Sequence, residues 1–108
     1  MKKLTINEEI FLIAIWHLRG DAYGVRIREQ IKDLSGQTLL LGTLYNTLDN
    51  LVKKGYVSTK KGEPTNQRGG HNKVFYRITE RGSAALNEAR ELHNRLWENI
   101  PDNAFGGI

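Results

Sequence analysis

Apolar residues recur at helical spacing in several segments of this 108-residue chain, and the most apolar segment lies near its start. Every residue from Ile10 to Trp16 is apolar, which predicts a helix that lies in the centre of the fold and ends near Leu18. Thr5 and Glu8 precede this run with the spacing of a capping box, in which two side chains accept hydrogen bonds from free amides of the first turn. We therefore expect the helix to begin directly after Thr5.

Two amphipathic helices are predicted next. One spans residues 23–34, and the glycine at position 36 suits the left-handed residue that commonly follows the end of a helix. Its inward side chains are expected to be Val25, Ile27, Ile31 and Leu34. The other begins at Leu41 or Gly42 and runs to Lys54, where Gly55 ends it in the same way.

A hairpin and a last helix complete the pattern. Residues 56–60 and 73–78 are rich in β-branched and aromatic residues and predict two strands, joined by a polar, turn-forming segment. Thr79 can cap a helix from Glu80 to about Asn99, which Pro101 ends. The predicted fold is mainly α with a small β-hairpin: a winged helix-turn-helix at residues 1–78, a C-terminal helix at 79–100 and a loose tail at 101–108.

The helix predicted at residues 41–54 has an uncharged polar face. Its apolar face carries Leu44, Leu48, Leu51 and Val52. The opposite face carries Thr43, Asn46, Thr47 and Asn50, and Tyr45 borders the apolar side. A solvated helix face is usually rich in Lys and Glu, whereas Asn and Thr can reach base edges in a DNA major groove and Tyr can bind a phosphate. We interpret this helix as a recognition helix, and the alternative is a merely polar surface helix.

Positive charge is concentrated in the hairpin. The chain has a net charge of +4, but residues 53–78 hold seven basic residues against one acidic residue, a local charge of +6. Such a block attracts a phosphate backbone, and Gly69 with Gly70 would let the chain approach a duplex closely. The side chains expected to contact DNA from this wing are Lys60, Lys61, Gln67, Arg68, His71 and Lys73. The alternative is a solvated basic hairpin without a partner.

The last helix carries a near-heptad apolar stripe. Its members are Ala85, Ala89, Leu92, Leu96 and Ile100. A helix of this length spans roughly 30 Å at 1.5 Å per residue, which is longer than a small winged-helix core can cover. The uncovered part predicts a second copy of the chain, paired about a two-fold axis. The alternative is a helix that folds back on its own core.

Other function classes find little support in the sequence. The chain has no cysteine, and its histidines, His17, His71 and His93, lack metal-ligand spacing, so we expect no metal site, no cofactor and no enzyme. The apolar run near the start is too short to cross a membrane and has no cleavage site, and we expect a cytoplasmic protein. No aromatic platform for RNA is evident. A winged helix that binds only proteins remains the alternative, although the basic wing favours nucleic acid.

Four segments together resemble the signatures of PadR-type regulators. They are residues Asp21–Ile27, Leu41–Leu48, Leu51–Val57 and Gly69–Thr79, and they follow one another in register and in order. Each segment alone is weakly specific, but the set is quite specific, and the similarity covers the chain from about Leu4 to Thr79.

The resemblance implies a winged helix that represses a promoter through a roughly palindromic operator, and a C-terminal helix that pairs the subunits. It also suggests that Tyr23 binds a phosphate, and a buried ring with a satisfied hydroxyl is the other interpretation. Some compact members bind flat aromatic compounds in a cavity at the dimer centre, lined by tryptophans of the last helix. Trp97 could line such a cavity or pack in a core or interface, and Trp16 is expected in the core unless the first helix approaches the same cavity.

Overall fold

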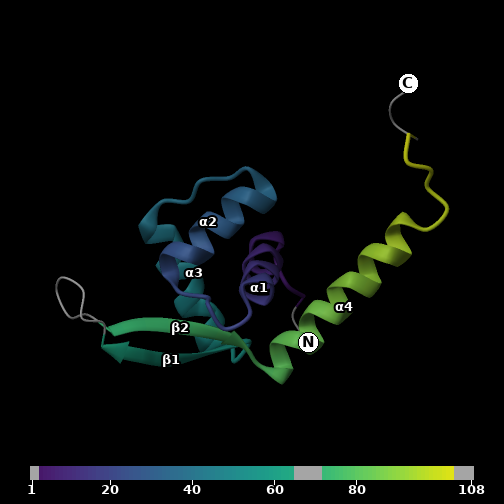
Figure 1. Ribbon diagram of the computed structural model, residues 1–108. Helices are drawn as coiled ribbons and strands as arrows, with labels where there is room; N and C mark the ends of the chain where they lie inside the picture. The colour runs from purple at the N-terminus through teal and green to yellow at the C-terminus, as the bar shows by residue number, and fades with distance from the viewer. Residues whose placement is uncertain (1–2, 65–71, 104–108) are drawn as a thin grey trace.

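The computed structural model describes residues 3–64 and 72–103. The elements of this part of the chain are α1 (Ile6–Leu18), α2 (Gly24–Ser35), α3 (Leu41–Lys53), β1 (Val57–Pro64), β2 (Asn72–Ile78) and α4 (Glu80–Trp97). Figure 1 shows α1 between the α2–α3 pair and α4, with the hairpin beneath α3. This order confirms the predicted winged helix-turn-helix followed by one further helix.

The capping box forms at the start of α1. The amide of Thr5 donates to Glu8 Oε1 at 2.8 Å, and the amide of Glu8 donates to Thr5 Oγ1 at 3.1 Å. α1 is not covered all round: Ile13 is 40% exposed, and the prediction that Trp16 lies in the core is wrong, because its side chain is 54% exposed. These two residues are three apart and share one side of the helix, which the rest of the described chain leaves open.

The inward face of α2 is narrower than predicted. Ile27 and Ile31 are buried, whereas Val25 is 52% exposed and Leu34 is 46% exposed, so their predicted inward placement is wrong. Val25 lies about 200° around the helix from Ile27, on the opposite face. Leu34 has the correct angle but stands in the last turn, past the core. Gly36 follows in the left-handed conformation with a φ of 74°, as predicted.

The predicted apolar face of α3 is confirmed. Leu44, Leu48 and Leu51 are fully buried against the other elements. The helix ends at Lys53, one residue earlier than predicted, and Gly55 follows with a φ of 80°.

The hairpin is longer than predicted and has a further partner. β1 pairs antiparallel with β2 from Val57 opposite Ile78, with an irregularity between Lys61 and Pro64. Sequence analysis ended the first strand at Lys60 because polar residues, Gly and Pro follow it. Tyr23 bridges to the other edge of β2, so the turn between α1 and α2 is attached to the hairpin.

The last helix begins as predicted and then leaves the body. Thr79 Oγ1 accepts from the amide of Gly82 at 3.0 Å, which caps α4. The helix ends at Trp97, and Asn99 then adopts a left-handed φ of 66°, so the chain turns before Pro101 is reached. Within residues 3–64 and 72–103, no helix is both long and apolar enough to cross a membrane.

Candidate nucleic-acid interface

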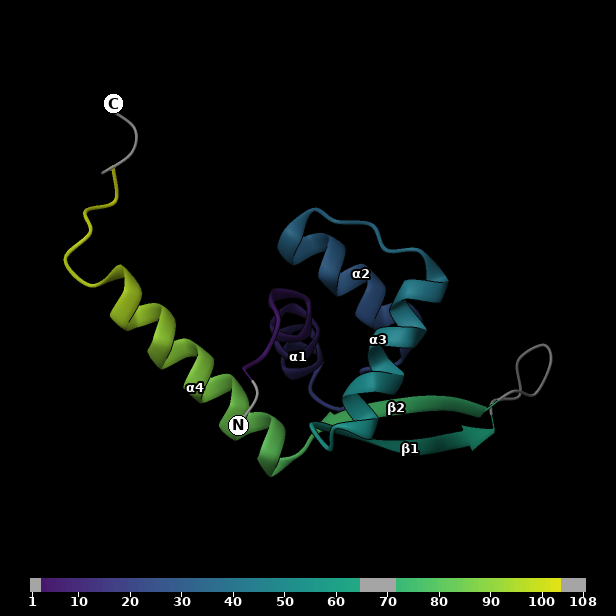
Figure 2. The same ribbon diagram turned by 180° about the vertical axis from the view of Figure 1, so that it is seen from behind.

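The beginning of α3 and the open end of the hairpin lie on the same side of the molecule. In both Figure 1 and Figure 2 this side faces away from the free end of α4. The two elements predicted to read DNA are therefore presented together, and the element predicted to pair subunits lies elsewhere.

The polar face of α3 is open to solvent. Thr43, Asn46 and Asn50 are exposed, and Thr47 is half-buried. The buried leucines on the opposite face hold this helix against the core. The structure thus brings the predicted recognition side chains together on one accessible surface.

Tyr45 crosses from α3 to the beginning of α2. Its ring is 43% exposed, and its hydroxyl would lie 2.3 Å from a Cβ atom placed on Gly24. Any larger residue at position 24 would therefore collide with the Tyr45 hydroxyl. Tyr45 is therefore held at the junction of the two helices of the helix-turn-helix, with part of its ring open to a partner.

Tyr23 belongs to an aromatic group on the hairpin. Its ring meets Phe75 edge to face at 5.7 Å between centroids, and Lys73 Nζ lies 4.2 Å from the centre of the Tyr23 ring. The ring is half-buried. No hydrogen bond to its hydroxyl is formed by residues 3–64 or 72–103. The predicted phosphate contact of Tyr23 stays a prediction.

The predicted cations of the wing are exposed where the structure describes them. Lys60 and Lys61 lie on β1 and Lys73 on β2, all with exposed side chains. The other predicted wing residues, Gln67, Arg68 and His71, lie outside the described residues.

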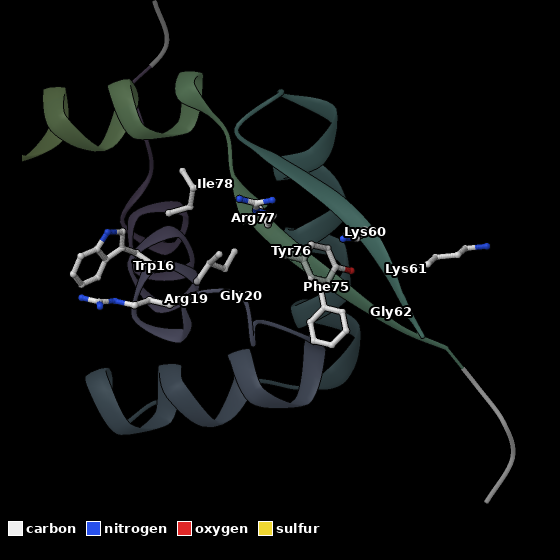
Figure 3. Close-up of a pocket in the computed structure, with 11 residues that line it drawn as sticks. Trp16, Arg19, Gly20, Lys60, Lys61, Gly62, Phe75, Tyr76, Arg77 and Ile78 are labelled. Atoms are coloured by element: carbon white, nitrogen blue, oxygen red, sulfur yellow. The ribbon is translucent and has the colours of Figure 1, made fainter. Parts of the chain in front are cut away.

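Two arginines that sequence analysis missed extend this positive surface. A hollow of about 770 Å³ between the end of α1 and the hairpin is lined by Arg19 and Arg77 together with Lys60 and Lys61 (Figure 3). Arg19 lies over the Trp16 ring, 5.1 Å from its centroid. Within the described part of the chain these four cations form no ion pair. Because Arg19 and Arg77 are far apart in sequence, only the bridge between the α1–α2 turn and β2 reveals their proximity.

Both ends of α3 are fixed by charged side chains of other helices. At its beginning, Arg28 Nε of α2 donates to the carbonyl of Leu39 at 2.7 Å. At its end, Lys54 Nζ donates to Glu8 Oε2 of α1 at 2.6 Å, and Glu8 is buried. Burial alone would raise the pKa of the Glu8 carboxyl, but hydrogen bonds from Lys54 and Thr5 outweigh it and lower the pKa below its ordinary value of 4.5. Both ends of the predicted recognition helix are therefore tied to other helices by hydrogen bonds.

The predicted dimer stripe is only partly available to a partner. Ala85 is 5% exposed and belongs to the chain's own core, so it cannot contribute as predicted. Ala89 and Leu92 are half-buried, whereas Leu96 is 61% and Ile100 38% exposed. Leu96, in the outer half of α4, is thus the exposed member of the helical stripe, whereas the predicted place of Ile100 on this stripe is wrong, because the helix ends at Trp97.

The two tryptophans lie on α1 and α4. Trp16 lines a groove of about 620 Å³ between these helices, with Ile13 and Leu86 among its apolar walls. Trp97 is 59% exposed at the end of α4. The imidazole of His93 contacts Glu9, with 2.9 Å between Nε2 and Oε1, and connects α4 to α1 across this groove.

In the described ranges no cluster of three or more His, Asp or Glu side chains could hold a metal ion.

Comparisons with known proteins agree with this arrangement. A family model described as the transcriptional regulator PadR-like family matches residues 12–88. No curated protein matches the chain. RosR from H. salinarum superposes with a TM-score of 0.71 at 23% identity, over 94% of this chain and 84% of that one. A PadR family regulator from hypervirulent Clostridium difficile superposes with a TM-score of 0.64 at 22% identity, over 86% of this chain and 92% of that one. A transcriptional regulator from Clostridium thermocellum superposes with a TM-score of 0.64 at 26% identity, over 86% of this chain and 90% of that one.

Proposed function

Because the chain belongs to the PadR-like family of transcriptional regulators, we propose that it is a repressor that binds a palindromic DNA operator as a homodimer. Members of this family regulate transcription and are not enzymes, in agreement with the sequence analysis. The regulatory class is shown by the family. The operator, the dimer and the sense of regulation are our proposal.

One observation carries the proposal: the open polar face of α3 and the basic hairpin are presented on the same side. Asn46 and Asn50 are exposed on this face and can donate to and accept from base edges in the major groove. Lys60 and Lys61 can neutralise phosphates beside the groove. A winged helix that binds only proteins does not require a basic hairpin beside the polar face of α3.

The dimer would form through the outer half of α4. Leu96 exposes apolar surface there, Ile100 does so just beyond the end of the helix, and Ile13 of α1 lines the adjoining groove. Burying this surface about a two-fold axis would place two copies of α3 about one helical turn of DNA apart.

A flat aromatic ligand bound between the subunits would act by population shift. Trp16 lines the α1–α4 groove, and the indole of Trp97 lies on the exposed part of α4. A ligand that stacks on them would favour the subunit spacing in which it binds best. If that spacing does not match the operator, the ligand releases the repressor.

Anisotropy of a labelled duplex tests the DNA proposal, with a sample whose mass is measured by light scattering. A dimer should bind random DNA with an affinity that falls as salt rises. Lys61→Ala should weaken binding to all sequences alike and reduce the salt slope, and Lys32→Ala on α2 is the matched control for loss of charge. Asn46→Ala should instead change the preferred sequence, at about 1–3 kcal/mol for a lost base contact.

The dimer has its own test. Leu96→Lys should convert the dimer to monomer, whereas Ala84→Lys, on an exposed part of the same helix, should not. A dimer that survives Leu96→Lys would remove the outer half of α4 from the interface. Absence of DNA binding by the intact dimer at low salt would refute the repressor proposal.

A further inference from the structure

Two leucines at the beginning of α3 are exposed without a partner in the described chain. Leu40 is 77% exposed, more than any other large apolar side chain in the described ranges, and Leu41 is 54% exposed. Leu40 is also the N-cap residue of α3, where its side chain makes no cap hydrogen bond. Ser, Thr, Asp or Asn would satisfy a free amide at this position. Leucine at this position therefore leaves a free amide of α3 without the cap that a short polar side chain would supply.

The leucine pair is nevertheless held in a defined place. The preceding residue, Leu39, is 5% exposed and anchors the segment in the core. Its carbonyl accepts a hydrogen bond from Arg28 Nε at 2.7 Å. The carbonyl of Leu40 accepts from the amide of Leu44 at 3.0 Å and so begins the helix. An anchored backbone on both sides of Leu40 presents its side chain outward in a fixed direction.

The position of the pair indicates what covers it. Thr43 of the polar face is two residues after Leu41, and the two leucines lie at the end of α3 that shares a side with the open end of the hairpin. A second copy paired through the outer half of α4 would sit on the opposite side of the molecule. Two leucines also offer far less area than a stable protein interface, which buries about 1,200 Å² or more in total. A contact with the edges of one or two bases does not require more area than two leucines offer.

We propose that Leu40 and Leu41 contact the C5 methyl groups of thymines in the major groove, and that they select operators with thymine at those positions. The methyl group is the apolar feature of the major-groove edge, and only thymine among the ordinary DNA bases carries it. This inference rests on the proposed function, since it requires that α3 enters the groove. It adds an apolar contribution to the hydrogen-bonding contacts of the polar face.

Replacement of thymine by uracil tests the inference, because uracil differs from thymine at C5 by this methyl group. The probe is a duplex that the protein itself selects from a random library, with each thymine changed to uracil in turn. Removal of one buried methyl should weaken binding about four-fold at one or two positions in each half-site. Leu40→Ser, which supplies a cap and should keep α3 folded, should abolish this effect at one position, and Leu41→Ala at its neighbour. Leu34→Ser removes another exposed leucine, 46% exposed at the end of α2, and should leave the effect intact.

The outcomes separate the inference from the proposed function. Sequence-selective binding that is indifferent to uracil at every position would overturn the inference and leave the repressor proposal standing. Sensitivity to uracil that persists in both Leu40→Ser and Leu41→Ala would also overturn it, because another side chain would then contact the methyl. Failure of the wild-type dimer to bind any duplex would overturn both. Thermal unfolding of each variant shows that loss of the effect does not come from loss of the fold.

Discussion

The ion pair between Glu8 and Lys54 offers a sharp test of how α3 is held. Glu8 is the buried charged residue of the described chain, and its carboxylate accepts from the Thr5 amide at 2.8 Å and from Lys54 Nζ at 2.6 Å. Glu8→Gln keeps an oxygen that can accept from Thr5, so the cap can persist. The variant removes the charge and with it the interaction that joins α1 to the end of α3.

The size of the effect follows from the unequal exposure of the partners. The side chain of Glu8 is 8% exposed, whereas that of Lys54 is 46% exposed. In Glu8→Gln the ammonium group of Lys54 can return to water. We therefore expect the unfolding free energy to fall by about 1–2 kcal/mol, which lies between the usual contribution of a surface ion pair and that of a hydrogen bond to a charged group. In Lys54→Met the buried carboxylate stays behind with the Thr5 amide alone, and we expect a larger loss of about 2–3 kcal/mol. The expected order, in which Lys54→Met loses more unfolding free energy than Glu8→Gln, is as informative as the magnitudes of the two losses.

The pH dependence gives a second signature. Since the pKa of Glu8 in the folded chain lies below its ordinary value of 4.5, the stabilisation is complete above that value and is lost as pH falls through the folded pKa. The difference between wild type and Glu8→Gln should thus be constant between pH 7 and about pH 5, and should shrink in more acid solution. Urea unfolding followed by circular dichroism measures it, at one fixed protein concentration because a dimer is stabilised by mass action.

A matched control uses a carboxylate in an exposed pair. Glu29 lies 3.1 Å from Arg26 on α2, with a side chain that is 56% exposed, and Glu29→Gln should leave the unfolding midpoint within error. If Glu8→Gln were as neutral as this control, or if its cost did not change with pH, the reasoning about the buried pair would be refuted.

Three further substitutions test the junctions around the hairpin and α3. Gly82→Ala should cost about 1–3 kcal/mol, because its Cβ would lie 2.2 Å from the carbonyl oxygen of Tyr56; normal stability by urea unfolding would contradict this. Thr79→Val removes the cap of α4 and should cost about 1–2 kcal/mol in the same assay, whereas Thr79→Ser should cost less. Arg28→Met removes the donor to Leu39 and should increase amide hydrogen exchange at the beginning of α3; unchanged exchange there would show that the contact is dispensable.

Local structure was predictable because its causes lie close together in sequence. The capping box of α1, the left-handed Gly36 and the cap at Thr79 each depend on residues within a few positions of one another, and all are confirmed. The buried face of α3 was predictable for the same reason, since helical spacing alone defines it. Strand ends were less predictable, because the pairing of β1 beyond Lys60 depends on the partner strand.

The candidate site was predictable as a set of surfaces and not as a set of contacts. The polar face of α3 and the cations of the hairpin follow from composition and spacing. Nothing in the local sequence shows that Glu8 and Lys54, which are 46 positions apart, form an ion pair. The approach of Tyr45 to Gly24 likewise depends on the crossing of α2 and α3, which sequence spacing leaves undefined.

The burial errors at Trp16, Val25 and Leu34 share a cause, because an apolar side chain at helical spacing was assumed to be covered by its own chain. Helical spacing places Trp16 on an apolar helix, yet it is more than half exposed in the single chain, and Leu96, assigned from its spacing to a dimer interface, is exposed as well. Leu40 is exposed as well, but at the opposite side of the molecule, beside the polar face of α3. One partner cannot cover both sides. The exposed side chains of α1 and α4 are suited to the proposed second copy of the chain, and those at the beginning of α3 are suited to the proposed duplex.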